Sequence, residues 1–212
     1  MKISLIKVVP APLSEKDIRK SEIWEKDIIL QTPENYMIYA DSGKGKTTFI
    51  NIIFGIRKDY SGEVFIDNKN IKSFSNYEIS KIRKERISVV PQGLMLFNEL
   101  TALENIQIKN KILNFKSEKE ILEMFEILDI QDFINKKTST LSYGQQQRLA
   151  IIRALCQKFE FILLDEIFSH IDKQNSLKAW NLIISEAEQQ NAGIIITSLE
   201  NNINIDINKF KV

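Results

Sequence analysis

A short glycine- and lysine-rich run has the composition of a phosphate-binding loop. The run consists of Ala40, Asp41, Ser42, Gly43, Lys44, Gly45, Lys46, Thr47 and Thr48. Gly43 and Gly45 allow the backbone to turn so that its N–H groups point inward toward an anion. Lys46 would then contact the outer phosphates of a nucleoside triphosphate, and the Thr47 hydroxyl would bind Mg²⁺. The run therefore predicts a site for a nucleotide with its magnesium ion.

The segments on either side of this loop are a strand and a helix, as such a loop requires. Residues 36–39 are aromatic and aliphatic, which is typical of a buried parallel strand. Residues 47–54 place their apolar side chains on one helical face, and Gly55 follows as a stop signal. Ala40 departs from the usual motif, which begins with glycine. Its methyl group is tolerated if the backbone angle φ stays negative there.

A second motif combines a helix cap with glutamine and glycine. Residues 141–148 read Leu-Ser-Tyr-Gly-Gln-Gln-Gln-Arg, and residues 149–155 continue with helical apolar spacing. Ser142 can cap the helix, and Gln145 can complete a capping box. Taken alone, this pattern predicts only a capped helix.

Two further polar sites follow apolar strands. The run of residues 161–164 ends in Asp165 and Glu166, and the run of residues 87–90 leads to Pro91 and Gln92. A carboxylate at a strand end can hold a magnesium-bound water, and its neighbour can act as general base toward an attacking water.

The order and spacing of these motifs resemble an ATP-binding cassette (ABC) ATPase over nearly the whole chain. In that family the signature motif Leu-Ser-Gly-Gly-Gln of one subunit caps the γ-phosphate held by another, so that two sites form in a head-to-tail dimer. The resemblance implies ATP and Mg²⁺ as ligands. Tyr143 replaces the first glycine of the signature. The signature residues are Ser142, Tyr143, Gly144 and Gln145.

The resemblance also assigns roles to the polar residues. It implies that Mg²⁺ is held by Thr47, Asp165 and Gln92, and that Glu166 is the general base. Gln92 matches the family's Q-loop glutamine, which senses the membrane partner. The loop that links the two sites of the dimer corresponds to residues 169–172. Within this loop, the resemblance assigns Ser169, His170 and Asp172 to the site.

The chain departs from the family at the switch position. In the family, the strand that matches residues 194–197 is followed by a histidine that contacts the γ-phosphate, but here Ser198 follows it. Serine donates one hydrogen bond and carries no charge near neutral pH. Loss of a donor aimed at transition-state charge typically costs on the order of 10²–10³ in rate. We therefore expect a slow ATP hydrolase. The single histidine, His170, is either a substitute for the missing contact or an interface residue.

The family usually stacks adenine on an aromatic side chain between the first two strands. Here that position offers Pro10, Ala11, Pro12 and Leu13, with Trp24 later in the chain. Loss of the stacking contact would cost on the order of 1–3 kcal/mol of binding free energy.

The implied fold class is α/β: a P-loop NTPase core with a mostly parallel sheet, a small antiparallel β subdomain and an inserted α-helical subdomain. Residues 1–91 would form the first part of the core with the β subdomain. Residues 92–147 would form the Q-loop and the helical signature subdomain, in which residues 101 to about 133 have a helical pattern. Residues 148–212 would form the second part of the core. Further expected strands are residues 2–9, 28–30 and 63–67, and residues 175–189 should form a long helix.

Composition is consistent with a compact intracellular domain. The 212 residues carry 29 Lys and Arg against 28 Asp and Glu, so no overall field recruits nucleic acid. The single Cys156 excludes an internal disulfide and fits a reducing compartment. No apolar run approaches the roughly 20 residues that a membrane helix requires. We expect a cytoplasmic protein that is peripheral on the membrane through partner subunits.

Residues 61–64 and 100–106 resemble the corresponding segments of the small cassettes that power lipoprotein release, macrolide export and antimicrobial-peptide resistance. The implied partners are a second cassette, identical or different, and integral membrane transporter subunits, but no nucleic acid. Residues 94–97 would line the groove for a partner's coupling helix, or else belong to the subdomain core. One alternative is a hydrolysis-impaired subunit that gates its partner. A DNA-repair or chromosome-structuring ATPase would need long coiled-coil arms, for which residues 92–142 are too short.

Overall fold

The computed structural model describes residues 1–11, 13, 15–199 and 207–212. Pro12, one of the residues at the expected adenine position, lies outside the described residues. The strands are β1 (Lys2–Pro10), β2 (Asp27–Gln31), β3 (Tyr36–Tyr39), β4 (Tyr60–Ile66), β5 (Lys69–Asn70), β6 (Ile87–Val90), β7 (Phe161–Asp165), β8 (Gly193–Ser198) and β9 (Asn208–Lys211). The α-helices are α1 (Glu15–Lys20), α2 (Lys46–Ile53), α3 (Asn76–Glu85), α4 (Ala102–Asn110), α5 (Glu118–Ile127), α6 (Tyr143–Leu155) and α7 (Lys173–Gln189).

The main sheet is parallel, with strand order β6-β7-β8-β3-β9. Its strands are apolar runs because both faces are buried. Along β7, Ile162 and Leu164 pack on one side, whereas Phe161 and Leu163 pack on the other. Because β3, β7 and β8 run parallel, their carboxyl ends meet at one edge of the sheet.

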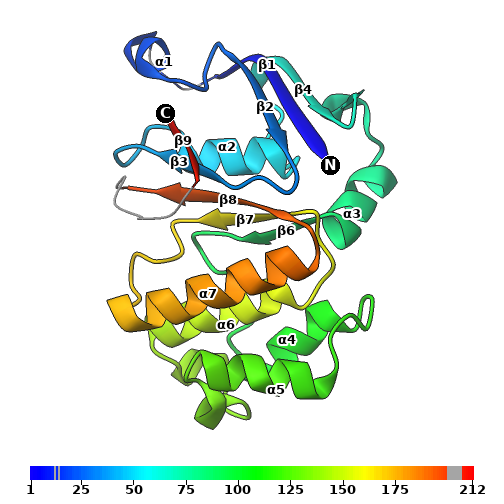
Figure 1. Ribbon diagram of the computed structural model, residues 1–212, viewed down its shortest axis with the longest axis vertical. Coiled ribbons are helices and arrows are strands. Elements are labelled where there is room, and N and C mark those ends of the chain that lie inside the picture. The colour runs from blue at the N-terminus through cyan, green and yellow to red at the C-terminus, as the bar shows by residue number, and fades with distance from the viewer. Residues whose placement is uncertain (12, 14, 200–206) are drawn as a thin grey trace.

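An antiparallel sheet with strand order β2-β1-β4-β5 lies over one face of the main sheet, and α2 lies between the two (Figure 1). One hydrophobic core joins α2 to inward-facing residues of both sheets, including Phe49, Leu5 and Ile38. Residues 63–67 were expected to form a hairpin arm, and β4 does pair antiparallel with β1 and β5.

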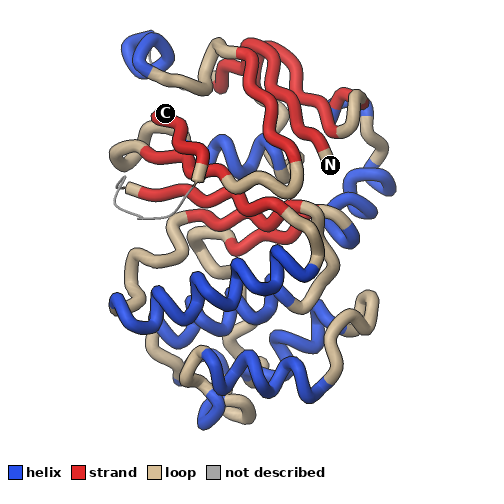
Figure 2. The backbone as a smooth tube through the Cα atoms, in the orientation of Figure 1, coloured by secondary structure: helices blue, strands red, loops and turns tan. Residues whose placement is uncertain are grey.

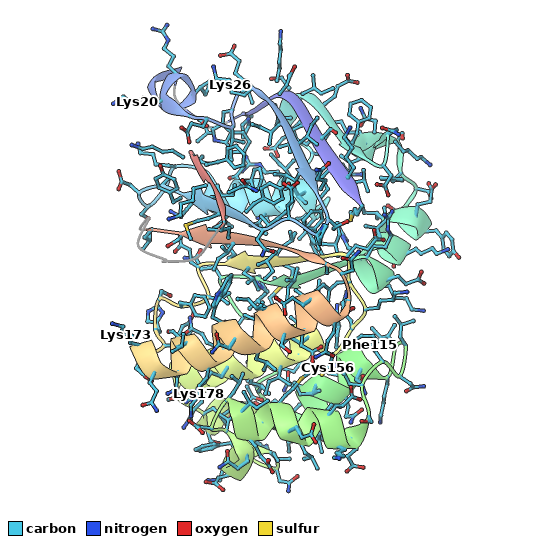
Figure 3. All side chains as sticks on the ribbon, in the orientation of Figure 1. Lys20, Lys26, Phe115, Cys156, Lys173 and Lys178 are labelled. Atoms are coloured by element: carbon cyan, nitrogen blue, oxygen red, sulfur yellow. The ribbon has the colours of Figure 1, made fainter. Side chains whose placement is uncertain are left out.

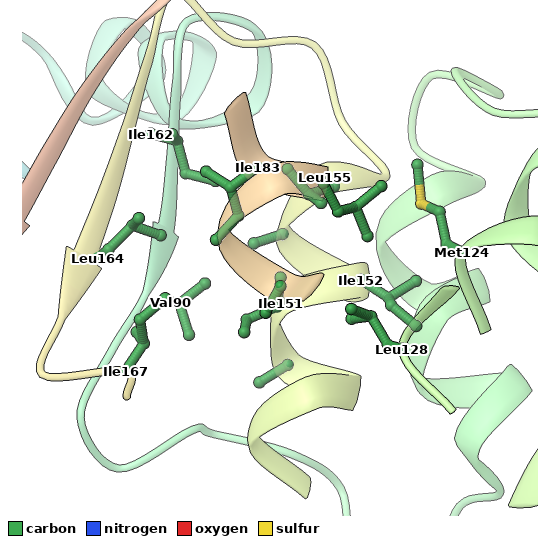
Figure 4. Close-up of a cluster of buried hydrophobic side chains, with 14 of the residues drawn as sticks. Val90, Met124, Leu128, Ile151, Ile152, Leu155, Ile162, Leu164, Ile167 and Ile183 are labelled. Carbon is green, nitrogen blue, oxygen red and sulfur yellow. The ribbon is translucent and has the colours of Figure 1, made fainter. Parts of the chain in front are cut away.

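Helices cover the opposite face of the main sheet in successive layers, with α6 and α7 against the sheet and α4 and α5 beyond them (Figure 2). A second core fills this side. In Figure 4, Ile151 and Leu155 of α6 lie between Leu164 of the sheet and Met124 of α5. Cys156 follows the last residue of α6 as its C-cap and lies in this core (Figure 3). It is a free cysteine. Burial raises the pKa of its thiol to about 12. The predicted α/β architecture is confirmed.

The expected helical stretch of residues 101–133 contains α4, α5 and a short 3-10 helix at Gln131–Phe133, with a break between α4 and α5. The break at residues 111–117 is held by the Asn110 side chain, which donates to the Lys116 carbonyl and accepts from the Lys116 N–H, each at 2.8 Å. Ser117 then starts α5 with a capping box. Local side-chain bonds of asparagine and serine compete with a continuous helix, which apolar spacing alone does not reveal.

The elements α1, α3, β5 and β9 were not expected from the sequence. The helix α3 buries only Ile82 and consists mostly of polar and charged residues, so few apolar side chains indicate it in the sequence. None of the helices within the described ranges is long and apolar enough to cross a membrane.

Candidate nucleotide site

The phosphate loop joins β3 to α2 with its glycines in the conformations that glycine alone adopts easily. Gly43 has φ 79° and Gly45 has φ 104°. Ala40 is buried and its backbone stays outside the left-handed region, so its methyl group causes no strain there. The loop thus keeps its expected turn in spite of the missing first glycine.

Lys46 lies at the start of α2 and is only 3% exposed. Its ammonium donates to the carbonyl oxygens of Ala40 at 2.7 Å and Asp41 at 3.0 Å. It also forms an ion pair with Glu166 Oε1 at 3.1 Å. A buried ammonium needs such partners, because an unpaired charge in a protein interior is strongly disfavoured. Lys46 therefore joins the phosphate loop to the carboxyl end of β7.

Asp165 is the buried last residue of β7. Burial raises the pKa of its carboxyl above the ordinary value, while hydrogen bonds from Thr197 and Thr47 act in the opposite direction. The Thr197 hydroxyl donates to Asp165 Oδ1 at 2.7 Å and accepts from the Glu166 N–H at 3.0 Å. Thr197 thus positions both acidic residues, a role that the sequence pattern did not reveal.

Glu166 and Gln92 lie side by side although they are far apart in sequence. The Gln92 side-chain amide donates to Glu166 Oε2 at 3.2 Å. Glu166 has φ 53°, a left-handed conformation that costs free energy for a residue with a side chain and is found mostly at functional sites. Both carboxylate oxygens of Glu166 are therefore oriented, one by Lys46 and one by Gln92.

The signature residues form the first turn of α6. The Ser142 hydroxyl accepts from the Gln145 N–H at 3.3 Å, and Gln145 Oε1 accepts from the Ser142 N–H at 2.8 Å, which is the expected capping box. Tyr143 is 44% exposed. A Cβ atom on Gly144 would lie 3.0 Å from the His170 carbonyl oxygen. The loop of residues 169–172 therefore packs closely against this turn.

The loop of residues 169–172 is bonded to Glu166 at one end and to the start of α7 at the other. The Ser169 hydroxyl donates to the Glu166 carbonyl at 3.1 Å and lies 2.8 Å from His170 Nδ1. Asp172 caps α7 by accepting from the Asn175 N–H at 3.0 Å.

Ser198 ends β8 beside Tyr39 of β3, and its carbonyl accepts from the Ala40 N–H at 3.3 Å. It therefore lies next to the phosphate loop. On the expected adenine side, Pro10 belongs to β1, Ala11 is exposed, and Leu13 is half-buried. Trp24 is fully buried, with its ring edge-on to Phe49, so it belongs to the core.

Comparison with known proteins decides the family of this site. A family profile described as ABC transporter matches residues 27–169, which include the phosphate loop, Gln92, the signature and Glu166. The chain belongs to the ABC transporter family. It is an ATP-binding cassette of the ABC-type ATPases.

Individual relatives agree with this assignment. The cassette is 33% identical over 173 residues to an uncharacterized ABC transporter ATP-binding protein, MJ0796, of Methanocaldococcus jannaschii, covering 78% of this chain and 74% of that protein. It is 33% identical over 164 residues to the lipoprotein-releasing system ATP-binding protein LolD of Buchnera aphidicola, covering 76% of this chain and 72% of that protein. The structure of the MJ0796 cassette described as a dimeric post-hydrolysis state bound to ADP and Pi matches with a TM-score of 0.79 at 29% identity, over 94% of this chain and 89% of that chain.

The residues predicted to hold Mg²⁺ have the chemistry that this ion needs beside a nucleotide. Within the part of the chain that the structure describes, no three His, Cys, Asp or Glu side chains cluster as a metal site. Mg²⁺ usually takes one or two carboxylates, keeps several waters and binds substrate phosphates. The hydrogen bond between Thr47 and Asp165 already brings a hydroxyl and a carboxylate together for such a shared site.

Proposed function

We propose that this cassette hydrolyses ATP slowly, as one half of a head-to-tail dimer that moves membrane subunits of a transporter or mechanotransmission complex. The observation that carries the proposal is the set of contacts around Glu166. Lys46 of the phosphate loop and Gln92 each hold one of its carboxylate oxygens. A general base must be held within hydrogen-bond reach of the water that it deprotonates.

In this proposal the residues of the site divide phosphate binding, metal binding and proton transfer among them. Backbone N–H groups of the phosphate loop and the Lys46 ammonium bind the phosphates, and Lys46 then leaves Glu166 for the γ-phosphate. Gln92 orients the carboxylate of Glu166, which accepts a proton from the attacking water. Thr47, Asp165 and Gln92 would hold Mg²⁺, which neutralises phosphate charge when it is bound.

The dimer is supported by the related cassette, which is described as dimeric in two solved structures. In such a dimer, Ser142 and Gly144 would face the partner's nucleotide. The capping box leaves the Ser142 hydroxyl hydrogen available as a donor, and the start of α6 favours negative charge.

Slow turnover is proposed because Ser198 occupies the switch position beside Ala40. The same observation favours a second candidate function, a nucleotide-dependent gate that barely hydrolyses. Two measurements separate these proposals: phosphate release by the wild-type cassette, and light scattering of Glu166→Gln with ATP. Dimerisation of Glu166→Gln with measurable wild-type turnover supports the hydrolase, whereas dimerisation without turnover supports the gate. A variant that stays monomeric in saturating ATP contradicts self-pairing.

A membrane partner would dock beside the segment of residues 94–97. Leu94 is buried in the helical core, but Met95 is 72% exposed and Phe97 is 54% exposed. Arg153 donates to the Leu94 and Met95 carbonyls, both at 2.6 Å, and both residues have left-handed backbones. The segment is therefore held in a fixed shape with two large apolar side chains outside.

The charge beside this segment defines the partner's chemistry. Burial and the nearby Arg153 guanidinium lower the pKa of Lys109, and the Lys109 ammonium has no hydrogen-bond or ion-pair partner among the described residues. We infer that the docking helix carries apolar side chains with a carboxylate that reaches Lys109. Lys109→Gln should weaken co-purification with membrane subunits, whereas Lys111→Gln, at the exposed end of α4, should not.

The branch of the family is also a proposal. Lipoprotein-releasing relatives support a cassette of that type, but relatives of similar identity include a molybdate/tungstate import protein of Thermococcus kodakarensis, 31% identical over 174 residues. Identification of the membrane chains that co-purify with the cassette tests the branch.

A further inference from the structure

The indole ring of Trp24 places a hydrogen-bond donor beside the phosphate loop. Trp24 is fully buried, and its Nε1–H has no hydrogen-bond partner among the residues that the structure describes. A buried donor without a partner costs free energy, so such groups are rare and call for an explanation. A Cβ atom on Gly45 would lie 3.2 Å from Trp24 Nε1, so the N–H edge of the indole lies against this glycine.

The backbone around Gly45 is suited to an anion. Gly45 is the N-cap residue of α2, and no side chain in the described part of the chain caps this helix end. The first turn of α2, which the structure describes in full, also holds no acidic residue. The positive end of the helix is therefore not neutralised, and its free N–H groups favour a phosphate. A phosphate oxygen bound beside Gly45 would supply the acceptor that the Trp24 N–H lacks.

Trp24 is held in place from two sides. The Ser21 hydroxyl oxygen accepts from the backbone N–H groups of Ile23 at 3.0 Å and Trp24 at 2.8 Å, which fixes the turn that carries the indole. On α2, Phe49 packs edge-on against the ring, with the centroids 6.1 Å apart. The donor is therefore preorganised, so little conformational entropy is lost when it binds a ligand.

Leu13 is the second side chain beside Gly45. Its Cδ1 would lie 3.5 Å from the same Cβ position, and it packs against the core that contains Trp24. Leu13 is only half-buried, so rotation of its side chain can uncover the N–H edge of the indole.

We propose that the Trp24 indole N–H binds a phosphate oxygen of the nucleotide, which makes Trp24 a nucleotide-binding residue as well as a core residue. This inference rests on the proposed nucleotide site. A contact to phosphate is the same for every base, and residues 10–13, at the expected adenine position, include no aromatic residue. Trp24 therefore strengthens the binding of ATP, ADP and GTP alike.

The two tryptophans of the chain provide a variant and its matched control. Trp24→Phe keeps an aromatic ring beside Phe49 and removes the N–H donor. Trp180→Phe makes the same change on α7, where Trp180 is 6% exposed and lies edge-on to Phe168. Trp180→Phe also leaves Trp24 as the single indole, so the emission of this variant reports on Trp24 alone.

Calorimetry on the full chain measures the affinity for Mg-ATP, Mg-ADP and Mg-GTP. Trp24→Phe should weaken the binding of each about 10- to 100-fold, the range expected for one lost hydrogen bond to a charged group. Trp180→Phe should match the wild type, and thermal melting should show that both variants are folded. A loss confined to the adenine nucleotides would mean a contact with the base and would overturn the proposal.

Fluorescence of Trp180→Phe tests the contact without removing it. Mg-ADP should shift the Trp24 emission to longer wavelength, because the N–H gains an acceptor, whereas adenosine, which has no phosphate, should not. Unchanged emission with Mg-ADP bound, or an equal shift with adenosine, would overturn the proposal even if Trp24→Phe did not fold.

Failure of the proposed function would look different. Wild-type protein that binds none of the three nucleotides would refute the nucleotide site and this inference with it. Nucleotide affinities that are equal in the wild type and Trp24→Phe would refute only the role of Trp24.

Discussion

The phosphate loop and the signature turn represent two different kinds of agreement with the family. Around the phosphate loop the charged and hydroxyl-bearing residues match the motif, and the one departure, Ala40, fits the backbone without strain. Around the signature turn the departures are large, and they contact one another through Tyr143 and His170. The phosphate loop thus keeps the motif's chemistry residue by residue, whereas the two departures at the signature turn fit each other by direct contact.

The largest expected effect is that of replacing Glu166. This residue contacts Lys46 of the phosphate loop and also Ser169, whose loop packs against the signature turn. Glu166→Gln should lower phosphate release by about 10²–10⁴-fold, the usual contribution of a general base, while ATP binding persists. Glu126→Gln, an exposed glutamate on α5, is the matched control and should leave turnover unchanged. Turnover of Glu166→Gln at the wild-type rate would remove Glu166 from its proposed role.

Ser198→His restores the histidine that the family has next to the phosphate loop, and so tests whether its loss slows hydrolysis. The new imidazole can donate toward the γ-phosphate, so we expect turnover to rise, up to on the order of 10²-fold. Phosphate release at saturating ATP is the measurement. If Ser198→His changes nothing while His170→Ala eliminates turnover, His170 makes the missing contact.

Lys46→Ala tests the phosphate loop alone. Loss of a charge-assisted hydrogen bond of about 1.5–3 kcal/mol should weaken ATP binding about 10- to 100-fold. Calorimetry on the purified variant measures the affinity, and Lys111→Ala provides the control. Equal ATP affinities for Lys46→Ala and wild type would contradict the phosphate-binding assignment.

The smallest expected effect lies in α5, remote from both regions. Hydrogen bonds from Ser117 lower the pKa of Glu120 to about 2. Because this pKa is depressed in the folded state, the stabilisation is present above about pH 4.5 and is lost as the pH falls toward 2. Glu120→Gln should lower the free energy of unfolding by about 0.5 kcal/mol near neutral pH, since the carboxylate is largely exposed.

Denaturant unfolding at pH 7 and pH 2.5 measures this difference, which should be smaller at the lower pH. A difference that grows on acidification would contradict the assigned pKa direction. ATP turnover should be unaffected, which makes this variant a baseline for the site variants.

Sequence predicted those features that have a recognised local motif. The capping box of Ser142 and Gln145 was expected and is present, because it depends on residues three positions apart. The helix break between Asn110 and Ser117 and the edge strand β9 were not expected. Their causes are a local side-chain bond and a pairing with Tyr36–Tyr39 from the other half of the chain.

The same reasoning applies to the site. Lys46, Asp165 and Glu166 could be assigned from local motifs, and the structure brings them together. The contacts of Tyr143 with Gln92 and His170, and of Arg153 with Leu94, join residues distant in sequence. No local pattern reports such a contact, because it exists only once the chain has folded.

The position of β3 has a consequence for the order in which the protein folds during synthesis. The antiparallel pairs of β1 with β2 and β4 involve only residues up to Ile66, so they can form early. β3 has β8 and β9 as neighbours, so the strand that precedes the phosphate loop waits for residues 193–211 to leave the ribosome. Pairings of such long sequence separation form slowly. A nascent chain can therefore complete the sheet around the phosphate loop only after residues 193–211 have been synthesised, and nucleotide added to arrested chains of increasing length would report that moment.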